Sequence, residues 1–170
     1  MHWLRQIFQP HQFVNEDYID LYHVYDNLSR TPFHHGIGIE CEDPNEYIMN
    51  PWHVITPIAM KRHLDWKNRI RTQFVSFYDN RAAALQEQQR RSGQRVVKDV
   101  GYRDPNSVRI AHVHIPRDTH LWVFSRTEML NMMGVFGDAA RLDMLKVSGA
   151  NEWLVWGVVP EELVVNRSEL

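Results

Sequence analysis

A single carboxylate stands at the head of an apolar segment near the C-terminus. Residues 151–160 (Asn-Glu-Trp-Leu-Val-Trp-Gly-Val-Val-Pro) form a β-branched and aromatic run of strand length, bounded by Gly149 and Pro160. A strand of this composition is buried, and an isolated buried charge is costly. Glu152 must therefore be paired, hydrogen-bonded or placed at the mouth of a site, which makes it the first candidate for chemistry.

Two further polar side chains stand on predicted strands. His23 lies in an alternating segment, residues 21–25 (Leu-Tyr-His-Val-Tyr), and Ser76 lies in a strand predicted over residues 73–78. Each candidate has an ordinary structural explanation: a core hydrogen bond for the histidine, tight packing for the serine, and an arginine salt bridge for Glu152. The order of histidine, serine and glutamate on an early, a middle and a late strand is what suggests a common site.

A metal site is the main alternative from residue types. His112 and His114 alternate on a predicted strand, so both imidazoles share one face, and His34, His35 or His63 would complete a zinc or iron site. Ten histidines in 170 residues make one such pair unsurprising, and no carboxylate cluster accompanies it. We therefore expect no metal, and keep a histidine-based metal enzyme as a lesser alternative.

The one cysteine, Cys41, has no local signature of a nucleophile and is interpreted as a small buried apolar side chain. A lone cysteine cannot form an intramolecular disulfide, which favours a reducing compartment. The first ten residues contain no apolar signal region, and no apolar run approaches the roughly 18 residues of a membrane span. We expect an intracellular, cytoplasmic protein without a membrane partner.

Length and composition indicate one globular domain over residues 1–170, with residues 1–20 as an irregular lead-in. A domain of this size buries roughly 70% of its unfolded surface and needs neither metal nor disulfide for stability. Hydrophobic residues make up 44% of the chain and aromatic residues 11%, which excludes a disordered chain. The net charge of -2 gives no general attraction to nucleic acid or anionic lipid.

The strands and helices that must position these candidate residues follow one another in an uneven order. A Thr56-Pro57 start and a Ser125-x-x-Glu128 capping box predict two of the helices. The predicted helices cover residues 56–69, 81–91, 125–134 and 139–146, and further strands cover residues 36–40, 108–115 and 163–165. Loops are predicted over residues 26–51 and 96–106, and the Gln, Glu and Arg tail of the second helix is interpreted as a solvated face.

This uneven order of short strands and helices predicts an α+β fold rather than a doubly wound parallel sheet. The chain contains no Gly-x-Gly-x-x-Gly, no Gly-Lys-Ser/Thr loop and no Gly-x-Ser-x-Gly elbow. Dinucleotide-binding Rossmann, P-loop and α/β-hydrolase folds are therefore disfavoured.

The ordered motifs resemble those of the ADP-ribosyltransferase fold. Leu21-Tyr22-His23 resembles the opening strand motif of its His-Tyr-Glu class, and Phe74-Val75-Ser76, followed by an alanine-rich helix, resembles the serine strand of its Arg-Ser-Glu class. The segment from Asn151 to Val155 resembles the strand that bears the glutamate. Over residues 20–165 the chain is similar to a group of uncharacterised fungal domains of this fold. The resemblance implies a split β-sheet core with peripheral helices.

The resemblance also implies NAD as substrate and assigns roles to residues. Glu152 would stabilise the oxocarbenium-like ribose as the nicotinamide glycosidic bond breaks, because a carboxylate facing developing positive charge favours that state. His23 would hold the adenosine-side ribose, and Ser76 would orient Glu152 or the nicotinamide ribose. The remaining roles are stacking on nicotinamide by Tyr25 or Tyr78, and diphosphate binding by Ser29 and Arg30 in the loop after the first strand.

The motifs depart from the family pattern at three places. Val24-Tyr25 replaces the Gly-Thr of the histidine class, the serine motif lacks its Ser-Thr-Ser form, and Ala150 replaces the second Glu or Gln of arginine-modifying members. Arginine is accordingly a poor candidate acceptor. The resemblance implies a glycosyltransferase in the broad sense, either an ADP-ribosyltransferase with a protein, nucleic-acid or small-molecule acceptor or an NAD glycohydrolase that uses water. The alternative is a catalytically silent protein-interaction domain on the same fold.

Overall fold

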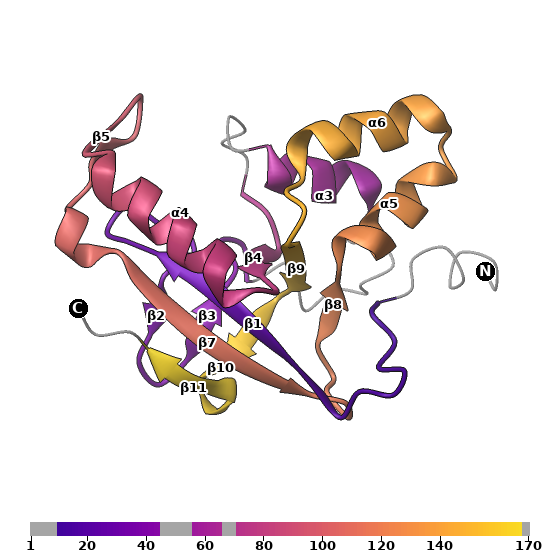
Figure 1. The fold of residues 1–170 in the computed structure, drawn as a ribbon, viewed down its shortest axis with the longest axis horizontal. Coiled ribbons are helices and arrows are strands. Elements are labelled where there is room, and N and C mark those ends of the chain that lie inside the picture. The colour runs from indigo at the N-terminus through magenta and orange to yellow at the C-terminus, as the bar shows by residue number, and fades with distance from the viewer. Residues whose placement is uncertain (1–9, 45–55, 66–70, 168–170) are drawn as a thin grey trace.

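Six strands form the central sheet of the computed structural model, which describes residues 10–44, 56–65 and 71–167. Figure 1 shows the arrangement of these strands. Their spatial order is β11-β7-β1-β4-β9-β8, and every neighbouring pair is antiparallel. The strands are β1 (Tyr18–Tyr25), β4 (Phe74–Tyr78), β7 (Arg109–Pro116), β8 (Trp122–Phe124), β9 (Glu152–Trp156) and β11 (Val164–Arg167). His23, Ser76 and Glu152 therefore come from three adjacent strands, β1, β4 and β9.

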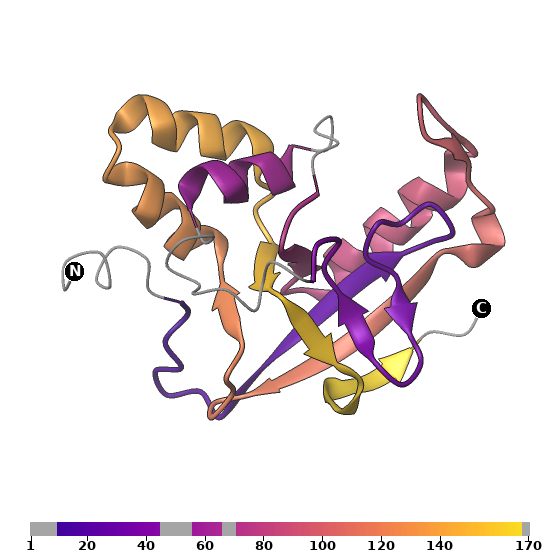
Figure 2. The same ribbon diagram turned by 180° about the vertical axis from the view of Figure 1, so that it is seen from behind.

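A second, three-stranded antiparallel sheet packs against one face of the first, as Figure 2 shows from behind. Its order is β10-β3-β2, with β10 at Val158–Pro160, β3 at Gly38–Glu40 and β2 at Phe33–His34. Ile39 and Val159 of this sheet are fully buried against Leu21, Phe77 and Val155 of the central sheet. This sheet-to-sheet core holds the strands that carry the candidate residues.

Four α-helices in the described residues cover the other face of the central sheet (Figure 1). They are α3 (Pro57–Leu64), α4 (Arg81–Gly93), α5 (Arg126–Gly134) and α6 (Asp138–Val147). α4 packs Ala84 on Val24 and Ile110 of β1 and β7, whereas α3, α5 and α6 pack on β4, β8 and β9 through Phe74, Phe124 and Leu154. Two groups of helices thus stand side by side on one face.

The helix starts agree with the sequence signals. The side chains of Thr56 and Asn80 accept backbone N–H bonds as N-caps, and Ser125 and Glu128 form the predicted capping box. α3 ends at Leu64, so the part of its predicted extent over residues 66–69 lies outside the described residues. Each helix within the described ranges is too short or too polar to traverse a lipid bilayer.

The predicted C-terminal strand is wrong in one respect, because residues 151–160 form two strands in two different sheets. Gly157 has a φ of 94°, a left-handed conformation that favours glycine, and it turns the chain from β9 into β10. The bend lets one apolar run contribute to both sheets. Glu152 still begins the first of the two strands, as predicted.

Three predictions for segments without regular secondary structure also differ from the structure. β1 begins at Tyr18, inside the predicted lead-in, and β2 lies inside the long loop predicted over residues 26–51, of which residues 45–51 lie outside the description. The loop predicted over residues 96–106 contains the hairpin of β5 (Val96–Val97) and β6 (Gly101–Tyr102) and a 3-10 turn. Two-residue strands carry too little alternation to be read from sequence.

The central sheet opens between β1 and β4. β1 pairs with β7 over eight residues, and β4 pairs with β9 over five, but β1 and β4 share only the pair Tyr22↔Tyr78. Among the described residues, no strand pairs with the β4 backbone beyond that residue pair on this side, and a buried carbonyl there needs another donor. The opening is where the candidate residues gather.

Candidate functional site

A cavity of about 620 Å³ lies on the helix-covered face where the central sheet opens. Its walls come from α4, α3 and the loop after β1, and its floor includes Ser76, Tyr78 and Glu152 of β4 and β9. Because Tyr78 pairs with Glu152 and Ser76 with Leu154, these three side chains share one face of the sheet. Six of the seven residues selected from the sequence line this cavity: His23, Ser29, Arg30, Ser76, Tyr78 and Glu152.

Glu152 is half-buried and forms no ion pair within the described residues. Its Oε2 accepts a hydrogen bond of 2.8 Å from the backbone N–H of Gly149, and a salt bridge to arginine, the ordinary explanation, is not present among the described contacts. Burial raises the pKa of the Glu152 carboxyl, and the nearby Glu87 carboxylate adds to the rise. A carboxylate held this way at a cavity floor is available to a ligand.

His23 bridges the opening between β1 and β4. Its Nδ1 lies 2.8 Å from the carbonyl oxygen of Ser76, and its Nε2 lies 2.6 Å from the carbonyl oxygen of Thr31. Burial lowers the pKa of His23, although both carbonyl contacts act in the opposite direction. A neutral imidazole has one N–H and can donate to only one carbonyl. The other ring nitrogen is then unprotonated, so its contact with the second carbonyl oxygen is not a hydrogen bond.

His63 of α3 contacts the side chain of Ser76. Its Nε2 lies 2.9 Å from the Ser76 Oγ, and its Nδ1 lies 2.5 Å from the Oγ1 of Thr72. Burial, followed by the positive charge of Arg30, lowers the pKa of His63 to about 3, so the ring is neutral at physiological pH. Sequence reasoning considered His63 only as a metal ligand and missed this contact.

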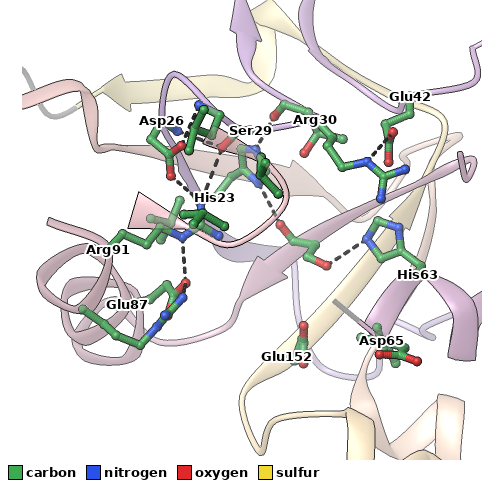
Figure 3. A pocket seen from close by; sticks show the side chains of 18 of the residues that line it. His23, Asp26, Ser29, Arg30, Glu42, His63, Asp65, Glu87, Arg91 and Glu152 are labelled. Carbon is green, nitrogen blue, oxygen red and sulfur yellow. Dashed lines mark hydrogen bonds and ion pairs between the residues drawn. The ribbon is translucent and has the colours of Figure 1, made fainter. Parts of the chain in front are cut away.

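A buried ion-pair network forms the wall opposite α3 (Figure 3). The Asp26 side chain is 1% exposed, and its Oδ2 lies 3.1 Å from the Nη1 of Arg91 and 3.2 Å from the Nε of Arg103. Glu87 binds Arg91 through its Oε1 and also binds Arg90. The predicted solvated face of this helix is therefore wrong for Glu87 and Arg91, whose side chains are 14% and 22% exposed.

The remaining residues predicted to contact NAD differ in whether they lie in the cavity and in what they contact there. Arg30 lines the cavity with its Nε 2.5 Å from the Oε2 of Glu42, while the Ser29 hydroxyl accepts the backbone N–H of Asp26 and closes the turn after β1. Burial, and then the Glu87 and Glu152 carboxylates, raise the pKa of Tyr78 to about 12, which keeps its phenol neutral. The structure does not bring Tyr25 to the cavity.

Tyr25 belongs to the other face of the sheet, where it packs at the edge of the core between the two sheets. Its ring stacks on that of His23 with centroids 5.9 Å apart. The strand pattern predicts this position, because Tyr22 pairs with Tyr78 on the helix-covered face and Tyr25 lies three residues further along β1, on the opposite face. His23 shares the face of Tyr25, and its ring lines the cavity because it lies at the opening between β1 and β4. Tyr25 can support the imidazole but does not line the space in which a nicotinamide ring would lie.

The alternative chemical groups lie apart from the cavity. His112 and His114 both contact the Oδ1 of Asp20, at 2.8 and 3.2 Å, and their rings stack on Tyr22 and Tyr18. Within residues 10–44, 56–65 and 71–167 no group of three or more His, Cys, Asp or Glu side chains is arranged to hold a metal ion. The structure thus does not bring His63 to the His112 pair.

Cys41 is 3% exposed in the core between the sheets. Burial raises the pKa of its thiol to about 11, so the thiolate needed for nucleophilic attack is scarce at neutral pH. The interpretation of Cys41 as a small buried apolar side chain is confirmed.

Fold and site together define a mixed α/β domain of antiparallel sheets with a charged cavity on its helical face. The chain belongs to a family described as a domain of unknown function, DUF7587, whose model matches residues 20–170. Neither the curated proteins nor the solved structures contain a match to the chain.

Proposed function

We propose that this domain binds NAD in the cavity and breaks its nicotinamide glycosidic bond, transferring ADP-ribose to an acceptor or to water. The observation that carries the proposal is the position of Glu152: a carboxylate at the cavity floor, on the strand next to Ser76, hydrogen-bonded to one backbone N–H and to no described cation. An unpaired carboxylate beside a space for a ligand suits a reaction that develops positive charge.

The arrangement of strands supports an ADP-ribosyltransferase-like core. The resemblance requires the histidine, serine and glutamate strands to converge on one cavity, and β1, β4 and β9 are adjacent in that order. A split sheet is also part of the resemblance, and the single register pair between β1 and β4 is an opening of that kind. These features support the proposed core without depending on any single motif.

The cavity supplies a group for each part of the proposed reaction. The Glu152 carboxylate would accept a hydrogen bond from a ribose hydroxyl and face the developing oxocarbenium ion, which stabilises the transition state more than the ground state. The guanidinium groups of Arg91 and Arg30, held by Asp26 and Glu42, offer preorganised donors for the diphosphate. Tyr78, neutral and beside Glu152, is the remaining aromatic group for nicotinamide.

The test is nicotinamide release from NAD by the parent and the Glu152→Gln variant. We expect the variant to lose activity by about 100-fold or more, the usual effect of removing one transition-state electrostatic contact. Its melting temperature should not fall, because the glutamine carbonyl can still accept the Gly149 N–H bond. Asp143→Asn, which alters a half-exposed carboxylate on α6, is the matched control and should release nicotinamide at the parent rate. Equal turnover in the parent and Glu152→Gln would remove Glu152 from catalysis.

A catalytically silent interaction domain is the second candidate, and one observation favours it. Both ring nitrogens of His23 face backbone carbonyls, and the Ser29 hydroxyl is used within its own turn, so two of the proposed ligand contacts have structural partners. A calorimetric titration with NAD separates the candidates. Heat of binding supports the NAD site, whereas a flat titration favours the silent domain.

A further inference from the structure

The side chains of Thr72, His63 and Ser76 form a hydrogen-bonded chain in the cavity wall that the proposed reaction does not yet use. The Oγ1 of Thr72 contacts the Nδ1 of His63, and the Nε2 of His63 contacts the Oγ of Ser76. All three residues line the cavity (His63 is labelled in Figure 3). The direction of the protons along this chain decides what Ser76 offers to a ligand.

The proton count fixes that direction. Thr72 is 5% exposed, and within the described residues the contact of its hydroxyl is with the Nδ1 of His63. A buried hydroxyl proton without an acceptor is costly, so the Thr72 hydroxyl donates and the Nδ1 accepts. The neutral ring then carries its one proton on Nε2 and donates it to the Ser76 Oγ. Because the Ser76 hydroxyl accepts this hydrogen bond from His63, its own proton remains available for donation to another group.

We propose that His63 is a positioning residue that makes the Ser76 hydroxyl a hydrogen-bond donor into the cavity. Ser76 and Glu152 lie diagonally across the β4–β9 pair, where Cβ atoms are about 7 Å apart. A single ligand hydroxyl oxygen can span such a gap, because it can accept from Ser76 and donate to Glu152. The identification of that hydroxyl with a ribose hydroxyl of NAD rests on the proposed function.

Because His63 donates its proton to Ser76, Ser76 cannot act as a nucleophile with His63 as its base. An activated serine must give its proton to the imidazole, which requires an unprotonated nitrogen facing the hydroxyl. Here the facing nitrogen, Nε2, already holds the proton, and Thr72 provides no carboxylate to stabilise an imidazolium. A fluorophosphonate probe, which labels activated serines, should leave Ser76 unmodified.

The direct test is the tautomer of His63 in the full chain, measured by ¹⁵N NMR of imidazole-labelled protein at neutral pH, with His63→Gln used to assign its signals. We expect an unprotonated Nδ1 and a protonated Nε2. An unprotonated Nε2, or a doubly protonated ring, would overturn the proposal. Because the tautomer is measured without NAD, this result stands or fails separately from any failure of the parent to release nicotinamide.

A matched pair of variants tests the consequence for Ser76. Thr72→Ser keeps the donor and should keep both the tautomer and kcat, whereas Thr72→Asp presents an acceptor to Nδ1 in place of a donor and should move the proton to Nδ1. The Nε2 then accepts from Ser76, so we expect Thr72→Asp to lower kcat about tenfold, the effect of losing one hydrogen bond to the ligand, with KM nearly unchanged. If Thr72→Asp kept the parent tautomer and kcat, Thr72 would not set the proton arrangement.

Discussion

Glu152 illustrates how one side chain can be costly to the fold and useful to a site. Its carboxylate receives one backbone N–H at 2.8 Å, where a well-satisfied buried carboxylate receives two or three. The loss of hydration is therefore only partly offset, and the pKa rises. A ligand that supplies a further donor or a positive charge would replace the missing interactions. A poorly satisfied charge in a cavity is for this reason a marker of function.

The raised pKa of Glu152 predicts how Glu152→Gln changes stability with pH. The folded chain holds the Glu152 proton at pH values above 4.5 where the unfolded chain has lost it, so the parent loses stability as pH rises through this window. Glutamine does not titrate. We expect the melting temperature of the variant, relative to the parent, to increase from acid to neutral pH. A difference that stays constant over that range would show that the carboxyl is not perturbed.

The sequence identified the residues of the cavity floor better than those of its walls. Glu152 and Ser76 could be found because each is a polar side chain on a short apolar strand, and strand alternation places both on one face. Arg103 and Asp26 are far apart in the chain, and their contact depends on how the 96–102 hairpin folds back. Glu87 and Arg91 have the spacing of an ordinary surface helix pair, which is why their burial was not predicted.

At the scale of elements, the loop after β1 is held to α4 by Asp26. Its Oδ1 accepts the N–H of Leu28 and its Oδ2 binds Arg91 and Arg103, so one carboxylate joins a turn, a helix and the segment after β6. The same loop carries Arg30 and the Thr31 carbonyl that faces His23. The geometry of the cavity entrance therefore depends on this buried ion pair.

Asp26→Ala is expected to be strongly destabilising. It leaves the Arg103 guanidinium, 9% exposed, without its carboxylate, and breaking one side of a buried pair costs about 3–5 kcal/mol. Arg90→Ala is the control, because Arg90 is 58% exposed and such pairs are worth about 1 kcal/mol or less. Urea unfolding of both variants measures the two free energies. Similar losses in the two variants would contradict the role of Asp26 as the anchor.

The second sheet depends on a close approach at Gly38. This residue has a φ of 115° and pairs with Pro160, and a Cβ there would collide with the carbonyl oxygen of Val159. Gly36 also has a positive φ, 84°, but a Cβ there meets nothing within 4 Å. We expect Gly36→Ala to cost about 1–2 kcal/mol from backbone strain alone. Gly38→Ala should cost more, because β3 and β10 must also separate.

Chemical denaturation of the two glycine variants provides the comparison, with the free energy of unfolding as the measured quantity. Equal losses would mean that the backbone of β10 relaxes around the new methyl group. A larger loss for Gly38→Ala would show that the β10-β3 contact is rigid. Because β10 continues directly from β9 through Gly157, a rigid contact would also fix the strand that presents Glu152.

At the scale of the whole molecule, the cavity results from how two groups of helices share one sheet face. α4 covers the β1 and β7 side and α3, α5 and α6 cover the β8 and β9 side, while the sheet between them opens at β1 and β4 (Figure 1). The α+β class and most elements could be predicted from local patterns. The opening could not, because it is set by a difference in pairing between strands that are distant in sequence.

This architecture makes ligand binding a test of the whole proposal, because a ligand that fits between the two groups of helices stabilises the folded state. With NAD at 100 times its Kd, the gain is about 2.7 kcal/mol, which for a chain of this size raises the melting temperature by about 5–11 °C. Glu152→Gln is the suitable protein for this measurement, since it should bind NAD without consuming it.

The control for this measurement is Asp26→Asn, which keeps an acceptor at the anchor but weakens the hold on Arg91 and Arg103. If NAD binds between the helix groups, the shift in melting temperature should be smaller in Asp26→Asn combined with Glu152→Gln than in Glu152→Gln alone. A shift in melting temperature of equal size in both proteins would indicate that NAD binds away from Arg91 and Arg103. No shift at millimolar NAD would contradict the NAD proposal and favour the silent domain, for which the cavity is a structural consequence of the open sheet.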